Sequence, residues 1–300
     1  SMIAGATLNI ILDAVFIIHW NMGIRGAAIA TMISNGASLV CFLVYYFSGR
    51  STLKIRPGIF VPDFKIMGQI VVIGVSGLAM TLSNSFSAIF LNNLLGIHGG
   101  DMAVSTFGLI NRAMVFIFMP CMVIGQGMQP ILGYNYGARK YDRVFKALKI
   151  SLGWSSGIAI AGFAIMNLFA GQIMSVFTSE EDLIAHAVYA IRRMFLGIYL
   201  IGFISVASIM FQALGKAAQS FIASVARPAL LLIPTLYILS SVWQLDGIWY
   251  TFPITDWLTA LVILALLIPQ IRDLRSKNAA EKRRVQAQTG VSLSPEQSLI

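Results

Sequence analysis

Three oxygen-bearing side chains lie in otherwise apolar runs near the beginning of the chain. Asn9 and Asp13 are four residues apart, so a helix places them on one face. Asp13 lies seven residues before Trp20, and Thr31 lies seven residues into the next run, so the three reach one depth. Carboxylate, amide and hydroxyl oxygens suit Na+, and a carboxylate can carry H+. The trio is a candidate cation-coupling site. The alternative is that Asp13 only hydrogen-bonds its neighbours and joins the two helices.

The composition places these residues in a membrane. The chain has 300 residues, of which 57% are hydrophobic and 11% are charged, whereas soluble domains carry about 25% charged residues. A carboxylate at the centre of a bilayer costs roughly 2.5–3.5 kcal/mol on insertion scales, which makes Asp13 a candidate functional residue. We therefore predict an all-α integral membrane protein, a polytopic helix bundle in a lipid bilayer.

The apolar runs predict eight membrane spans, because about 20 apolar residues cross a bilayer. They cover residues 2–20, 24–47, 67–95, 102–128, 145–170, 187–213, 218–242 and 247–269. The polar stretch 48–66 contains two helix-breaking prolines and divides the chain into a two-helix piece, 1–47, and a six-helix piece, 67–269. The basic tail, 270–300, is expected to be disordered.

The distribution of charge predicts the orientation. The net charge is +9, and most lysines and arginines lie in alternate gaps between the runs and in the tail. Because positive residues collect on the inner side, 48–66, 129–149 and the C-terminus are predicted to be cytoplasmic in a multi-pass protein of the cell inner membrane. This scattering over loops does not indicate a nucleic-acid partner.

Other polar side chains within the later runs are candidates for the lining of a cavity or for contact with substrate. These are Asn84, Asn92, Arg112, Arg227 and Asp256. Arginines inside a membrane usually face a cavity or pair with acids, and Asp256 is one candidate partner. Asparagines also join helices by hydrogen bonds, so both interpretations stay open.

Recognisable catalytic and metal-binding patterns are missing from the sequence. His19, His98 and His186 have no ligand-like spacing, so no metal site is predicted beyond Na+ at Asn9, Asp13 and Thr31. There is no nucleophile triad and no phosphate-binding loop. We expect no enzyme and no cofactor apart from H+ or Na+ as the coupling ion.

A weak internal repeat relates the first two runs to the last two. A shift of 221 residues places Gly26 on Gly247 and residues 10–18 of the first run on 231–239. Both pairs would cross the membrane in the same order, so the repeat is parallel, which is one signature of transporters. Asn9, Asp13 and Thr31 then fall on the apolar or proline residues Leu230, Pro234 and Phe252, so the polar trio belongs to the first copy alone.

Several segments resemble the MATE (multidrug and toxic compound extrusion) transporters of bacteria. The most specific is 129–146, QPILGYNYGARKYDRVFK, which resembles a cytoplasmic loop of that family. FQALGKA at 211–217 is similar to the next inner loop, and 245–256 to the last outer loop and helix. Segments 8–13 and 23–28 resemble helices five and six of twelve, so the resemblance covers residues 1–270.

The resemblance implies two six-helix lobes about a central cavity, of which this chain would hold helices five to twelve, with a truncated N-lobe. It implies a multidrug efflux antiporter that exchanges small organic cations for H+ or Na+ by alternating access, and that is monomeric at full length. The cation site of the family includes residues that match Asn9, Asp13 and Thr31. The alternatives are a lipid-linked oligosaccharide flippase of the same superfamily and a non-transporting fragment.

Overall fold

The computed structural model describes residues 2–49 and 63–289, and all regular structure in these two ranges is helical. The chain forms two compact units, Ser1–Met67 and Gly68–Ile300. Residues 50–62, which make up most of the predicted linker 48–66, lie outside the described residues, as do 290–300 of the predicted tail.

The first unit is a helical hairpin. Helix α1 (Met2–Asp13) continues into the π-helical turn η1 (Ala14–His19), and α2 (Gly23–Phe47) returns beside them. The chain reverses where Asn21 and Gly23 have positive φ values of 51° and 56°. The two arms approach closely at glycine, since a Cβ atom at Gly26 would lie 3.0 Å from the Cβ atom of Phe16. Small residues at helix crossings are typical of membrane bundles.

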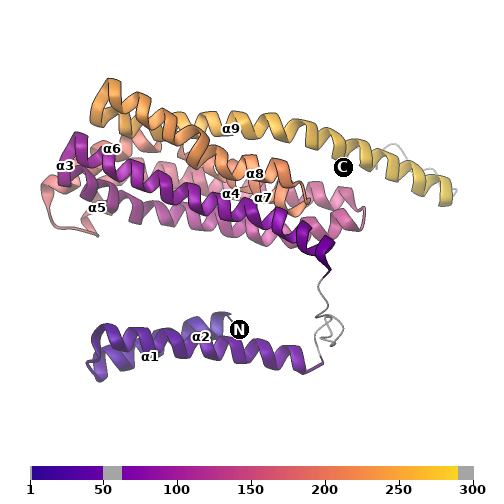
Figure 1. Ribbon diagram of the computed structural model, residues 1–300, viewed down its shortest axis with the longest axis horizontal. Coiled ribbons are helices and arrows are strands. Elements are labelled where there is room, and N and C mark those ends of the chain that lie inside the picture. Colours follow the sequence, from indigo (N-terminus) through magenta and orange to yellow (C-terminus); the bar gives the residue numbers. More distant parts are fainter. Residues whose placement is uncertain (1, 50–62, 290–300) are drawn as a thin grey trace. The chain divides into compact units, whose positions relative to one another are not determined.

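The second unit is a bundle of longer helices (Figure 1). Its elements are α3 (Phe64–Gly137), α4 (Tyr141–Leu168), α5 (Ala170–Ser175), α6 (Glu181–Met194), η3 (Phe195–Leu200), α7 (Ile201–Ala213), α8 (Ala217–Val225), η4 (Ala226–Leu231) and α9 (Leu232–Thr289). Two of them are interrupted by residues with positive φ, α3 at Gly100 and α9 at Gln244. Each interruption separates two spans of the sequence prediction.

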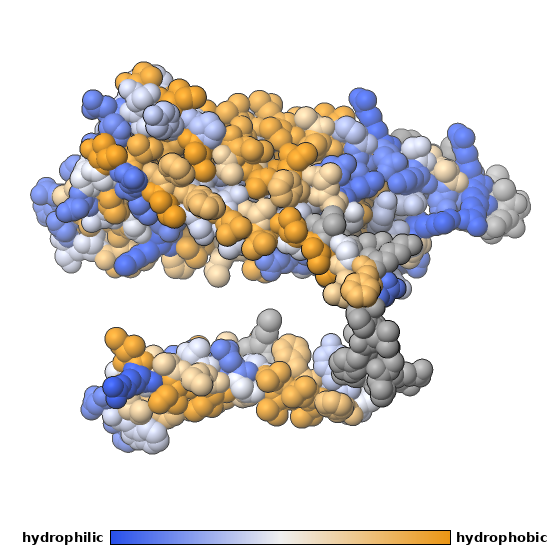
Figure 2. All heavy atoms as spheres, viewed as in Figure 1, coloured by the Kyte–Doolittle hydropathy of each residue, from blue (hydrophilic) through white to orange (hydrophobic). Residues whose placement is uncertain are grey.

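The described helices account for the eight predicted spans. Five helical stretches are long and apolar enough to cross a membrane, and the interruptions divide two of them, 74–137 and 217–284. The shorter apolar helix, 3–19, supplies the remaining span. Figure 2 shows hydrophobic residues along the middle of the second unit and hydrophilic residues toward its ends. Phe116 and Trp154 are 73% and 69% exposed, as expected of side chains that contact lipid. The prediction of an all-α multi-pass membrane protein is confirmed.

The predicted disorder of the tail is wrong for residues 270–289, which continue α9 to Thr289. Leu274 is fully buried in a cluster with Leu132 and Val144, so the helix has an apolar anchor beyond the span. Polar contacts extend the anchor, because Asn278 and Lys282 both reach Asp142 at the start of α4. The charge of the tail alone predicts disorder, because these partners lie far away in the sequence.

The backbone supports the predicted internal repeat. Positive φ values occur at Gly23 (56°) and at Gln244 (50°), which the 221-residue shift superimposes. Three residues later each copy has a glycine at a tight helix crossing, where a Cβ atom on Gly247 would clash with the carbonyl oxygen of Leu239. The two hairpins thus share a positive φ value and a closely packed glycine at matching positions.

Candidate functional site

The first unit leaves two polar atoms of the predicted trio unpaired. Nδ2 of Asn9 and Oδ1 of Asp13 are both buried and have no hydrogen-bond partner. A buried unpaired donor or acceptor costs about 1–3 kcal/mol, and more when it is charged. The two atoms lie one turn apart on one face of α1. Oδ1 of Asp13 is an acceptor that H+ or a cation can satisfy, whereas Nδ2 of Asn9 is a donor and needs an acceptor.

The hydroxyl of Thr31, unlike Nδ2 of Asn9 and Oδ1 of Asp13, has a hydrogen-bond partner. It donates a hydrogen bond to the carbonyl oxygen of Ala27, one turn back in α2, at 2.9 Å, and the residue is exposed. Among the described residues no hydrogen bond joins Thr31 to Asn9 or Asp13. Since a donating hydroxyl keeps its lone pairs, its oxygen could still act as a ligand to a cation. The side-chain oxygens of Asn9, Asp13 and Thr31 are suitable ligands for H+ or Na+, with Asp13 supplying the carboxylate oxygen.

Two of the charged candidates, Asp13 and Arg227, lie at a π-helical turn. Asp13 immediately precedes η1, and Arg227 lies within η4. A π-helical turn re-aims side chains and releases backbone groups, and such turns are frequent at functional sites. Pro228 explains η4, because proline lacks the N–H group that a regular α-helix requires. The carbonyl oxygen of Pro228 instead accepts a hydrogen bond from the Ser87 hydroxyl.

Arg227 and Asp256 form a buried ion pair within the second unit. Nε of Arg227 donates to Oδ1 of Asp256 at 2.7 Å, and the Asp256 side chain is 3% exposed. The arginine also lies over the ring of Phe118, 5.4 Å from its centroid. Asp256 can approach the bundle because a neighbouring residue is Gly197, where a Cβ atom would lie 2.9 Å from that of Asp256. The pairing that the sequence offered as one candidate is present.

A cavity of about 380 Å3, lined mostly by apolar residues, adjoins this ion pair. Arg227 and Asn84 line it, together with Asn111, which the sequence analysis did not single out. Asn92 and Arg112 are exposed and do not line this cavity. Asn111 is a polar residue within an apolar run, immediately before Arg112, and this pattern could have identified it as a candidate. The structure thus brings Asn84, Arg227 and Asp256 together and leaves Asn92 and Arg112 apart from them.

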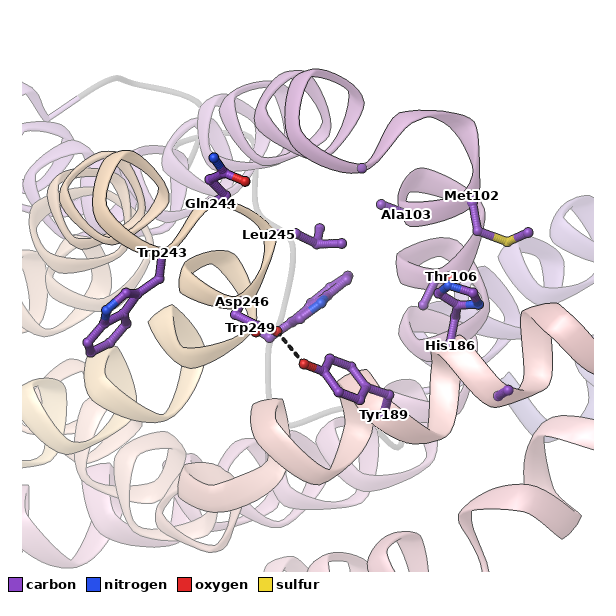
Figure 3. Close-up of a pocket in the computed structure, with 12 residues that line it drawn as sticks. Met102, Ala103, Thr106, His186, Tyr189, Trp243, Gln244, Leu245, Asp246 and Trp249 are labelled. Carbon is purple, nitrogen blue, oxygen red and sulfur yellow. Dashed lines mark hydrogen bonds between the residues drawn. The ribbon is translucent and has the colours of Figure 1, made fainter.

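A second hollow, of about 560 Å3, lies where α9 is interrupted at Gln244 (Figure 3). It is lined by side chains of α3, α6 and α9, among them His186, Tyr189, Asp246 and Trp249. The residues that line this hollow come from segments far apart in the chain, so no sequence motif predicts it.

Known proteins are similar to this chain in sequence and in structure. The MatE family model matches residues 73–238. Multidrug export protein MepA of Staphylococcus aureus (strain MSSA476) is 28% identical over 283 residues, which cover 93% of this chain and 61% of MepA. MepA of Staphylococcus haemolyticus (strain JCSC1435) is 25% identical, with coverage of 94% and 61%. The chain therefore spans about 61% of the length of these curated relatives.

Solved structures agree with the sequence relatives. An outward-facing multidrug resistance MATE family transporter of the MOP superfamily matches with a TM-score of 0.83 and 26% identity, over 91% of this chain and 62% of that one. A MOP superfamily transporter from Pyrococcus furiosus, for which a reversed polarity of the binding pocket suggests a different function, matches with a TM-score of 0.82 at the same identity and coverage.

Proposed function

The chain belongs to the MatE family, and on this premise we propose that the protein exports small organic cations from the cell in exchange for inward H+ or Na+. The names of the relatives, multidrug export proteins, support this substrate class. The exchange would follow alternating access in the cell inner membrane, by a monomer whose C-terminus is cytoplasmic. We propose no covalent chemistry, in keeping with a transporter rather than an enzyme.

The unpaired carboxylate of Asp13 is the observation that supports a coupling role. A charged, unpaired oxygen buried in a membrane helix is destabilising unless a cation or a proton neutralises it. Binding of H+ or Na+ at Asp13, with Asn9 and Thr31 as neighbours, would remove this cost. The proposed cycle therefore alternates between neutralised and charged Asp13, and an organic cation favours the charged state.

The test is ethidium transport into everted vesicles, driven by a pH or Na+ gradient. We expect Asp13→Asn to abolish gradient-driven transport, because the amide carries no charge to neutralise. Asp13→Glu should retain part of it. The matched control is Asp101→Asn, which removes an exposed carboxylate at the end of a span and should transport as the wild type does. Equal transport by wild type and Asp13→Asn would exclude coupling through this residue.

The flippase alternative needs a strongly cationic cavity for a pyrophosphate headgroup. Arg227 supplies one cation to the cavity of the second unit, but Asp256 neutralises it at 2.7 Å. Among the described residues, this cavity therefore lacks the strongly cationic lining that a pyrophosphate would need. Folded protein that transports no ethidium, as wild type or as variant, would favour the flippase or a non-transporting chain.

A further inference from the structure

The interruption of α9 at Gln244 places a carboxylate between two hollows. Trp243 and Asp246 line both the hollow of about 560 Å3 and a neighbouring one of about 590 Å3. Tyr250 and Ile254 complete the second hollow. Pockets for small molecules typically measure roughly 300–1,000 Å3, so each hollow is large enough for one. All the residues belong to the second unit, and none lines the cavity at Arg227.

The carboxylate of Asp246 is only partly neutralised. The Tyr189 hydroxyl donates to its Oδ1 at 2.7 Å, as Figure 3 shows. Nε of Arg193 lies 3.7 Å from the same oxygen, beyond hydrogen-bonding distance, and has no hydrogen-bond partner. Both contacts use Oδ1, and the side chain remains 48% exposed. The Asp246 carboxylate therefore keeps negative charge, and this charge faces the two hollows.

The aromatic residues around Asp246 already hold a cation. The guanidinium of Arg193 lies 3.4 Å from the centroid of the Tyr189 ring and 5.8 Å from that of Tyr250. Trp243 packs edge-to-face on Tyr250, with centroids 6.2 Å apart, and is 54% exposed. Aromatic faces beside a carboxylate are the chemical pattern that recognises organic cations. Arg193 shows that the pattern works here for a flat, delocalised cation.

We propose that the hollows beside Trp243, Asp246 and Tyr250 form a binding site for aromatic organic cations, distinct from Asp13 and from the cavity at Arg227. A metal ion would need several oxygen ligands, whereas this site offers one carboxylate and aromatic walls. Tryptophans at a membrane boundary are common, but that placement accounts neither for the half-neutralised carboxylate nor for the hollows on both sides of it. Arg193 competes for the same groups and therefore lowers the affinity of the site for its ligand.

The test is an anisotropy titration of ethidium with purified protein in dodecyl maltoside, without any gradient. All proteins carry Asp13→Asn, so that cation binding in the first unit does not contribute. We expect Asp246→Asn to weaken binding about tenfold and Trp243→Leu roughly three- to tenfold. Asp246→Glu should bind nearly as the parent does. Two matched controls, Asp101→Asn and Trp154→Leu, remove an exposed carboxylate and an exposed tryptophan outside the two hollows and should leave binding unchanged.

A gain of affinity provides a second test that poor folding cannot imitate. Arg193→Gln removes the competing guanidinium, and we expect it to bind ethidium roughly two- to fivefold more tightly. Uncharged phenanthridine, with a similar ring system, should bind alike to the parent and to Asp246→Asn. The proposal is overturned if Asp246→Asn binds ethidium as the parent does, if Asp101→Asn weakens it equally, or if Arg193→Gln weakens it. Because no gradient is used, these results do not depend on whether Asp13 couples transport.

Discussion

Arg227 and Asp256 illustrate how a single pair of residues determines the character of a membrane cavity. Asp256 alone would be a buried charge and Arg227 a partly buried one, and together they form a neutral pair at 2.7 Å. A buried ion pair seldom stabilises a fold relative to apolar residues, but the loss of one partner leaves the other charge uncompensated. The pair therefore neutralises the one charged residue that the described part of the chain places in the cavity lining, and it contributes little net stability.

The difference between losing one partner of the pair and replacing both predicts the stability of three variants. Arg227→Met should lower the free energy of unfolding by about 3–5 kcal/mol, because it leaves the buried Asp256 carboxylate without its partner. Asp256→Leu should lower it less, because the unpaired Arg227 is 22% exposed. The double variant should recover most of that loss. The measurement is unfolding by SDS titration in mixed micelles, with Arg112→Met, an exposed arginine, as the control. Single variants as stable as the control would show that the pair is dispensable.

At the scale of the elements, close helix crossings position the polar groups. The carbonyl oxygen of Gly202 on α7 accepts a hydrogen bond at 3.2 Å from the Ser155 hydroxyl on α4. A Cβ atom on Gly202 would clash with the backbone of Ser155 and Ser156. In lipid, helices associate through such close packing, because burial of apolar area offers little driving force there.

The crossing predicts a large effect from one methyl group. Gly202→Ala should separate α4 from α7 and destabilise the protein by about 1–3 kcal/mol, as overpacking does. Gly157→Ala on α4, where a Cβ atom meets open space, is the matched control. It should be neutral or stabilising by up to about 1 kcal/mol, because alanine favours the helix. Thermal unfolding in detergent compares the two, and a similar shift in both would exclude the crossing as the cause.

For the whole second unit, the C-terminal end of α9 joins segments that lie far apart in the sequence. Nδ2 of Asn278 donates to Oδ1 of Asp142 at 2.7 Å, and Nζ of Lys282 lies 3.1 Å from the same oxygen. Nζ of Lys277 also donates to the Tyr136 hydroxyl at 3.3 Å. These contacts hold the last turns of α9 against the connection between α3 and α4.

The contacts predict protection of the helix end from protease. Asp142→Ala removes the shared acceptor of Asn278 and Lys282, so trypsin should cut after Lys277 and Lys282 roughly two- to fivefold faster. The effect is modest because exposed ion pairs contribute about 0–1 kcal/mol. Asp182→Ala, at a different exposed site, should digest as the wild type does. Unchanged cleavage in Asp142→Ala would mean that Leu274 alone anchors the helix.

The sequence by itself determined the properties that depend on local order along the chain. The length of each apolar run predicts a span, because bilayer thickness sets the number of residues required. The four-residue spacing puts Asn9 and Asp13 on one helix face. The 129–146 motif indicated the family that the comparisons then showed. The role of Asn9, Asp13 and Thr31 in coupling stays a prediction.

The tertiary structure decided which distant residues meet. Arg227 pairs with Asp256 rather than with another acid because Gly197, which has no side chain, allows α9 to approach at that point. Hydrophobic periodicity carries no such information. Asn111 lines the cavity and Arg112 beside it does not, since adjacent residues on a helix point in different directions. The helical tail and the hollows at Asp246 likewise arise from contacts between remote segments, which only packing of the whole unit can bring together.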